Sequence, residues 1–306
     1  MSLFRYALAV AVVGVIALAV MAWFWPINDD FRSQNPAWNG SEQLSELPGV
    51  EALEKLADLP AEAAGTTLIV VPYIAFSLDE LAALDGFLEA GGTLIVADDY
   101  SYGNQLLEHL GVATRFSGVV LLDPLHSHKN GWLPLVSHFR GDALTEGVAS
   151  LVFNHATILE GMAAADVLAW SSSFSFLDVD KNGVWSEAES QGPFPVIASQ
   201  LLAQGHLVIV ADPSIFINGM EELGDNLTFI ENIASNAPGG LFIDQSHLPP
   251  SSLHKAKDVL EVFRDAAVTP AGRLGLVLLS VVVIPLLMWT GKKAISPNGK
   301  GDGDDS

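Results

Sequence analysis

The chain has 306 residues, of which 14 are basic and 36 acidic, for a formal net charge of −22. A surface this acidic repels nucleic acid, so we expect no nucleic-acid partner. The chain has no cysteine, which excludes disulfides, thiolate metal ligands and a cysteine nucleophile.

The first expected element is an apolar segment at the N-terminus. Residues Tyr6–Trp25 carry no charge, and Pro26 ends the run. A membrane span needs about 20 apolar residues, so we expect residues 1–26 to form a transmembrane anchor. The alternative is a cleaved signal peptide, although its apolar core is only about 7–15 residues long and precedes a small-residue cleavage site.

Alternating strands and helices follow the anchor. The apolar runs Thr66–Tyr73 and Thr93–Ala97 predict buried strands, and Leu78–Ala90 between them has helical spacing. Ser77 and Glu80 predict a capping box at the start of that helix. A second helix is expected over Asn104–Leu110. This order predicts an α/β domain over residues 27–272, built on a parallel sheet with both faces covered.

The middle of the domain has shorter, more β-like runs. Residues 112–173 predict either additional strands on the sheet or a β-rich insertion. After them, residues 178–189 read DVDKNGVWSEAE and match the calcium-loop pattern D-x-[DN]-x-[DN]-G-x₅-E at every position. The expected Ca²⁺ ligands are the side chains of Asp178, Asp180, Asn182 and Glu189, the backbone carbonyl of Val184, and Ser186 directly or through water.

The surroundings of this loop favour a structural role. It is a single loop, and neither flank has a helical pattern, so we expect a Ca²⁺ clamp that fixes local geometry and no signalling switch. The alternative is a turn rich in Asp, Asn and Gly that binds nothing.

The strand–helix rhythm returns near the end of the domain. We expect a helix or strand–helix junction over Phe194–Ala203, a strand over Leu207–Ala211 and a helix over Asn226–Ala234. Ligands of open α/β sheets bind beyond the carboxyl ends of the strands, where this sequence predicts a polar crevice. Its candidate residues are Asp98, Asp99, Asn104, Asp212 and Asn218. The alternative is that aspartates after strands cap helices or form Asx turns.

A second apolar segment predicts a C-terminal transmembrane helix over residues 273–291, followed by a disordered cytoplasmic tail over residues 292–306. Arg5 precedes the first segment, and Lys292, Lys293 and Lys300 follow the second. The positive-inside rule therefore predicts a protein of the cell membrane with two spans, both termini in the cytoplasm and the central domain outside it.

Three stretches resemble the DUF4350 family of membrane-anchored proteins: Asp29–Leu44, Leu84–Gly111 and Gly192–Gly219. The resemblance implies a flavodoxin-like fold similar to class I glutamine amidotransferases. It also implies membrane partners, among them a MoxR-type AAA ATPase and DUF58-type proteins. Amidotransferase activity is not expected, because its nucleophile is a cysteine.

These observations favour a non-enzymatic binding or scaffold subunit of an envelope complex, with a structural Ca²⁺ loop in its outer domain. The alternative is a metal-dependent hydrolase that uses Asp98, Asp99 and Asp212, which would require these carboxylates to converge on a metal with an open coordination position.

Overall fold

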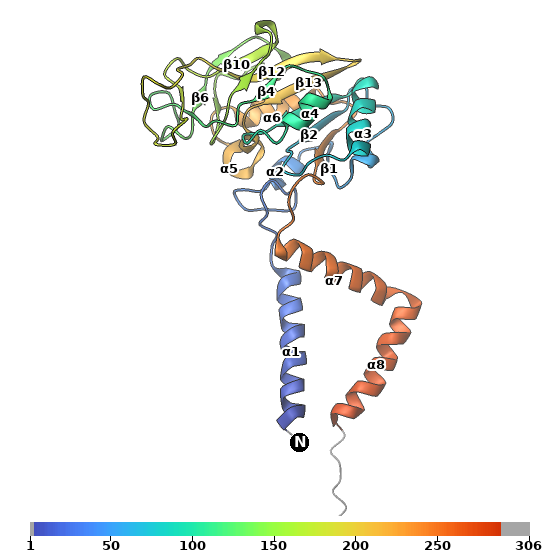
Figure 1. Cartoon of the computed structure of the whole chain (residues 1–306). Helices are drawn as coiled ribbons and strands as arrows, with labels where there is room; N and C mark the ends of the chain where they lie inside the picture. The colour runs from blue at the N-terminus through green and yellow to red at the C-terminus, as the bar shows by residue number, and fades with distance from the viewer. Residues whose placement is uncertain (1–2, 289–306) are drawn as a thin grey trace, which may run out of the picture. The chain divides into compact units, whose positions relative to one another are not determined.

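The computed structural model describes residues 3–288, and the chain divides into two compact units. One unit is Pro26–Ser251, and the other consists of the chain before Pro26 and after Ser251. Figure 1 shows the strands of the first unit and the helices of the second.

An eight-stranded sheet forms the centre of the Pro26–Ser251 unit, in the order β1-β14-β2-β3-β13-β12-β10-β7. The first five strands pair in parallel and the last three join antiparallel, which confirms a mixed α/β fold with a mostly parallel sheet. The strands are β1 (Val50–Leu53), β2 (Thr67–Val70), β3 (Thr93–Ala97), β7 (His138–Phe139), β10 (Val167–Trp170), β12 (Pro195–Leu202), β13 (Gly205–Val210) and β14 (Leu241–Asp244).

The three central strands β2, β3 and β13 are apolar on both faces. Leu68–Val70, Leu94–Ala97 and Leu207–Val210 are all buried. A parallel strand with both faces covered has this continuous apolar character. The parallel register aligns Val70 with Val96 and Val96 with Ile209, so the carboxyl ends of these strands lie together at one edge of the sheet.

Helices connect the parallel strands. The capping box predicted for α3 is present, because Ser77 Oγ accepts from Glu80 N while the Glu80 carboxylate accepts from Ser77 N. Crossovers between parallel strands are almost always right-handed, and this rule predicts α3 and α6 on opposite faces of the sheet. The helices of this unit are α2 (Glu42–Ser45), α3 (Leu78–Glu89), α4 (Asn104–His109), α5 (Asn218–Glu221) and α6 (Asn226–Ser235), with 3-10 turns η1 (Leu56–Asp58), η2 (Ala143–Thr145), η3 (Ala164–Asp166) and η4 (Pro213–Phe216).

The helix or junction expected over residues 194–203 is wrong. These residues form β12, which pairs antiparallel with β13 through a two-residue turn in which Ala203 has a φ of 55°. The buried run Val196–Ala198 is too short to distinguish a helix from a strand by periodicity, and its β-branched residues suit the sheet.

Both alternatives for residues 112–173 occur. β7 and β10 extend the main sheet, whereas other short strands form three small antiparallel pairs. These pairs are β4 (Arg115–Phe116) with β9 (Leu159–Glu160), β5 (Leu121–Leu122) with β11 (Phe176–Leu177), and β6 (Leu135–Val136) with β8 (Leu151–Val152).

The two ends of this unit are joined by hydrogen bonds. The Arg32 guanidinium donates to the carbonyl oxygens of Gln245 and Leu248 over 2.8 and 2.6 Å. Ser251 N donates to Asp29 Oδ2 over 3.0 Å. We call these bonds the terminal clasp, which holds the first and last residues of the unit side by side.

The second unit contains α1 (Leu3–Phe24), α7 (Ser252–Val268) and α8 (Pro270–Met288). Within the described part of the chain, only α1 is by itself long and apolar enough to cross a membrane, over Tyr6–Phe24. α7 and α8 meet that criterion only as a pair, and they are bent by 92°. The span expected over residues 273–291 runs past Met288, so its end and the tail over residues 292–306 lie outside the described residues.

Candidate functional site

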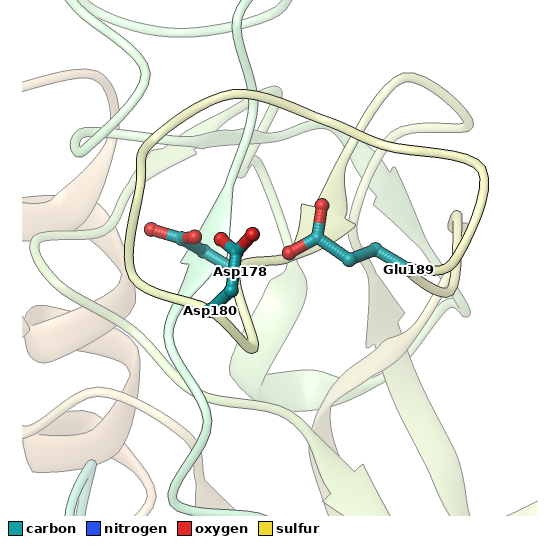
Figure 2. Close-up of side chains that lie close together, drawn as sticks. All are labelled: Asp178, Asp180 and Glu189. Carbon is teal, nitrogen blue, oxygen red and sulfur yellow. The ribbon is translucent and has the colours of Figure 1, made fainter.

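The loop over residues 178–189 brings three carboxylates together. One oxygen from each of Asp178, Asp180 and Glu189 lies within 4.8 Å of the others. Figure 2 shows the three side chains reaching into the space that the loop encloses. Among the described residues, no other group of three or more potential ligating side chains gathers this closely.

The short strand β11 and the residues after the loop close its base. Leu177 N donates to Ser190 O over 3.1 Å, and Phe176 forms an antiparallel bridge with Gln191. Leu177 and the next residue, Asp178, are both buried, so the loop begins inside the domain. The loop is therefore held between two strand-like segments, unlike the two helices that flank a paired calcium sensor.

Backbone N–H groups fix the carboxylates. Asp178 accepts from Asn182 N through Oδ1 and from Gly183 N through Oδ2, over 3.0 and 3.1 Å. Glu189 accepts from Val179 N and Ser186 N, so it joins the two ends of the loop. A carboxylate has about four lone-pair sites, and these bonds leave each of the two groups able to ligate a cation.

The three converging carboxylates are hard oxygen donors, the kind of ligand that Ca²⁺ prefers. Four acidic residues and Lys181 give the loop a net charge of −3. No lysine or arginine within residues 3–288 forms a salt bridge with Asp178, Asp180 or Glu189. Gly183 has a φ of 74°, in the left-handed region that position six of such a loop needs.

The other expected ligands lie in the same loop. Asn182 donates to Asp180 Oδ2 over 2.7 Å and accepts from Val184 N over 2.7 Å. Ser186 is half-buried, and its backbone N–H donates to Glu189 Oε2. Val184 is exposed. The loop thus combines three converging carboxylates with the amide, hydroxyl and carbonyl oxygens of its remaining positions.

The second set of expected residues lies at the carboxyl edge of the sheet, where two aspartates have capping roles. Asp98 accepts from Tyr100 N and Gly103 N over 2.8 and 2.6 Å. Asp212 caps η4 by accepting from Ser214 N, and its other oxygen accepts from Asn154 N. Both carboxylates therefore accept backbone N–H groups of turns and caps, which is the alternative to a ligand-binding role that the sequence left open.

Asp99 differs from its neighbours. Its Oδ1 is buried and has no hydrogen-bond partner in the described part of the protein. Burial, followed by the charges of Asp212 and Asp98, raises the pKa of Asp99 to about 8. Burial also raises the pKa of Asp212 to about 7, despite its hydrogen bonds to Asn154 and Ser214.

The side-chain amides of Asn104 and Asn218, both expected in the crevice, form hydrogen bonds with backbone groups. Asn104 accepts from Phe116 N and donates to Phe116 O, which ties α4 to β4. Asn218 donates to the carbonyls of Asn35 and Ala37. Both side chains thus use their amide groups to connect segments, and neither contributes a free polar group to a ligand crevice.

Sequence reasoning missed three tyrosines at this edge. Tyr73 follows β2, and Tyr100 and Tyr102 follow β3, so the same argument from strand ends would have found them. Burial raises the pKa of Tyr73, with a further contribution from the charge of Asp99. The tyrosines and aspartates therefore share one polar environment.

The structure is a mixed α/β domain with a loop in which three carboxylates converge. The family model "Domain of unknown function (DUF4350)" matches residues 33–234. The chain belongs to the DUF4350 family, which confirms the resemblance found in its sequence.

No curated protein matched the sequence. Among solved structures, the mmIFT52 N-terminal domain is 14% identical with a TM-score of 0.43, covering 54% of this chain and 74% of that domain. A ThuA-like protein from Bacteroides uniformis is 15% identical with a TM-score of 0.37, covering 65% and 83%. A β-galactosidase from Bacillus circulans sp. alkalophilus is 13% identical with a TM-score of 0.36, covering 57% of this chain and only 23% of the enzyme. Similarities this distant support no inference about function.

Proposed function

We propose that this protein is a membrane-anchored, non-enzymatic binding or scaffold subunit of an envelope complex whose outer domain is stabilised by Ca²⁺. The observation that carries the Ca²⁺ part is the gathering of Asp178, Asp180 and Glu189 within 4.8 Å. Three carboxylates so close together repel one another, and a divalent cation between them would replace that repulsion with attraction.

The role proposed for Ca²⁺ is structural. Asp178 and Glu189 lie at the two ends of the loop, so one ion bound to both would join the segment after β11 to the segment before β12. The remaining proposed ligands are Asp180, Asn182, Ser186 and the carbonyl of Val184. Because the loop is exposed between its ends, the ion would reach it without a conformational change of the core.

The proposal includes a membrane topology. The length and apolar character of α1 support one anchor. A second span over residues 273–291, cytoplasmic termini and an extracytoplasmic domain complete the arrangement. The five parallel strands of the sheet support the flavodoxin-like, amidotransferase-like relation of the domain as part of the same proposal.

The absence of native cysteine allows a direct test of this topology. A membrane-impermeant maleimide should label a Ser190→Cys variant in intact cells, because Ser190 is exposed on the domain. It should label a Ser296→Cys variant only after the cells are permeabilised. The reverse pattern would contradict the proposed orientation.

The hydrolase alternative receives less support. Asp98 and Asp212 each use both oxygens to accept backbone N–H groups. In the described part of the chain, the carboxylate oxygens of Asp98, Asp99 and Asp212 do not all lie within 4.8 Å of one another. Under the favoured proposal the partners are membrane proteins, with a MoxR-type AAA ATPase and a DUF58-type protein as the first to test by co-purification.

Calorimetric titration tests the Ca²⁺ site. The full chain in a non-ionic detergent should bind Ca²⁺ with one saturable site, and the Asp178→Ala and Glu189→Gln variants should not. Glu187→Gln is the matched control, because it removes a charge from the same loop at an exposed position outside the cluster. Absence of saturable binding by the unaltered chain would reject the site.

A further inference from the structure

A group of three tyrosines stands at the carboxyl edge of the sheet. The ring centroids of Tyr73 and Tyr100 are 6.4 Å apart, those of Tyr73 and Tyr102 are 5.9 Å apart, and those of Tyr100 and Tyr102 are 6.1 Å apart. The rings are inclined to one another by 47–58°. We call this group the tyrosine triad, in which each ring lies close to both of the others.

The triad is open to solvent. Tyr100 is 58% exposed and Tyr102 is 55% exposed, whereas Tyr73 is half-buried. Scattered exposed aromatic side chains need no explanation, but three that lie together form a surface suited to recognition. The hydrophobic core does not require either exposed ring, so a role outside the core is indicated.

The backbone holds these rings in place. Asp98 accepts from Tyr100 N and Gly103 N, which closes the turn that carries Tyr100 and Tyr102. Ser101 between the two tyrosines has a φ of 68°, in the left-handed region. On the other side, Phe31 packs against Tyr73 at a centroid distance of 5.6 Å. The triad is therefore arranged before any ligand arrives.

Carboxyl groups lie close to the aromatic rings. Burial and then the charge of Asp99 raise the pKa of Tyr73, and the charge of Asp99 is the first cause of the raised pKa of Tyr100. No lysine or arginine in the described chain forms a salt bridge with Asp98, Asp99 or Asp212. The buried Oδ1 of Asp99 also lacks a hydrogen-bond donor among residues 3–288.

We propose that the tyrosine triad, together with Asp99, binds an organic ammonium cation. Aromatic faces attract a cation that lies within about 6 Å of the ring centroid. The spacings of the triad allow one cation to meet this limit for all three rings at once. Asp99 would release its proton as the cation binds, and its carboxylate would then balance the charge. The methyl groups of a quaternary ammonium would cover the exposed ring surface.

The chemistry of the site favours an ammonium cation over a metal ion. The neighbouring aspartates do not gather as metal ligands within the described chain, and two of them are used by backbone N–H groups. A quaternary ammonium needs no hydrogen bonds and loses little hydration, so aromatic surface suits it better than it suits Na⁺. The site shares no residue with loop 178–189, so the proposal does not rest on Ca²⁺ binding there.

Ligand-observed nuclear magnetic resonance tests this proposal with choline as the probe. The full chain, in a detergent without an ammonium group, should broaden the choline methyl signal in a saturable manner. The neutral isostere 3,3-dimethylbutan-1-ol, which has carbon in place of nitrogen, should not bind. Equal binding of both compounds, or no saturable binding of choline, would overturn the proposal.

Variants assign the binding to the triad. Removal of one cation–π contact is worth about 0.5–2 kcal/mol, so Tyr100→Ala and Tyr102→Ala should each weaken choline binding by about 2- to 30-fold. Tyr100→Phe keeps the ring and should bind nearly as tightly, whereas Asp99→Asn should weaken binding. Phe174→Ala removes an exposed ring outside the triad and should have no effect.

Two further controls keep the test decisive. Thermal unfolding should be almost unchanged in the Tyr100 and Tyr102 variants, because both side chains are more than half exposed. Competition by NaCl should be weak compared with competition by tetramethylammonium chloride at the same ionic strength. Equal competition by the two salts would mean that acidic charge alone attracts the cation, and it would reject the aromatic site.

Discussion

The sharpest prediction concerns the thermal stability of the chain in Ca²⁺. Extracellular Ca²⁺ modules bind with a Kd of about 10⁻⁴–10⁻³ M, so Ca²⁺ at about 10 mM is roughly 10–100 times Kd. A ligand that binds only the folded state then adds about 1.4–2.7 kcal/mol to the free energy of unfolding. For a unit of the size of Pro26–Ser251, this gain raises Tm by about 3–11 °C.

The quantity to compare among variants is the rise in Tm when a chelator is replaced by Ca²⁺. Asp180→Ala removes an exposed carboxylate ligand of the cluster and should abolish most of the rise. Glu187→Gln removes the same charge from the same loop, outside the cluster, and should keep the full rise. Mg²⁺ should stabilise less, because it demands a smaller octahedral site and dehydrates reluctantly.

The measurement is a set of thermal melts of the full chain in detergent, followed by circular dichroism. The reasoning fails if Ca²⁺ leaves the Tm of the unaltered chain unchanged. It also fails if Asp180→Ala and Glu187→Gln lose the rise equally, because the effect would then come from total charge and not from the three converging carboxylates.

The remaining predictions concern the fold and its carboxyl edge. Because burial raises the pKa of Asp99 from 3.8 to about 8, the folded chain keeps a proton that the unfolded chain releases, so the free energy of unfolding should fall as pH rises through this window. Asp99→Asn should make urea melts less dependent on pH, and an unchanged slope would contradict that assignment. Gly205→Ala would place a Cβ 2.2 Å from Gly92 O and should cost about 3 kcal/mol in the same melts, whereas Gly141→Ala meets open space and should cost little. Asn226→Ala removes three buried hydrogen bonds between its side chain and the backbone, so it should cost about 3 kcal/mol, and a loss near zero would show that water replaces them.

The elements that could be predicted are those whose signal is local. Strands β2, β3 and β13 are continuous apolar runs, and Ser77 and Glu80 specify the start of α3 three residues apart. The calcium-type loop is also local, since all its expected ligands lie within twelve consecutive residues. The two-residue strands of the insertion carry no measurable periodicity, so only their general β character could be predicted.

The position of each tyrosine at a strand end could be predicted from local pattern, but the contacts among the three rings could not. Tyr73 meets Tyr100 and Tyr102 because β2 and β3 pair in parallel with Val70 opposite Val96. That register depends on packing between segments about 25 residues apart, which no single window of the sequence contains. The capping roles of Asp98 and Asp212 were foreseen only as an alternative, since a strand-end aspartate serves either purpose.

The terminal clasp has a mechanical consequence. Both connections to the apolar segments leave the domain next to each other, where Arg32 bonds to Gln245 and Leu248 and Asp29 bonds to Ser251. Tension applied through the two connections would load these few bonds first and would reach the strands of the sheet only after they had broken. The bonds of the clasp would therefore break before the rest of the domain is stretched. Until then the loop and the tyrosine triad would keep their arrangement.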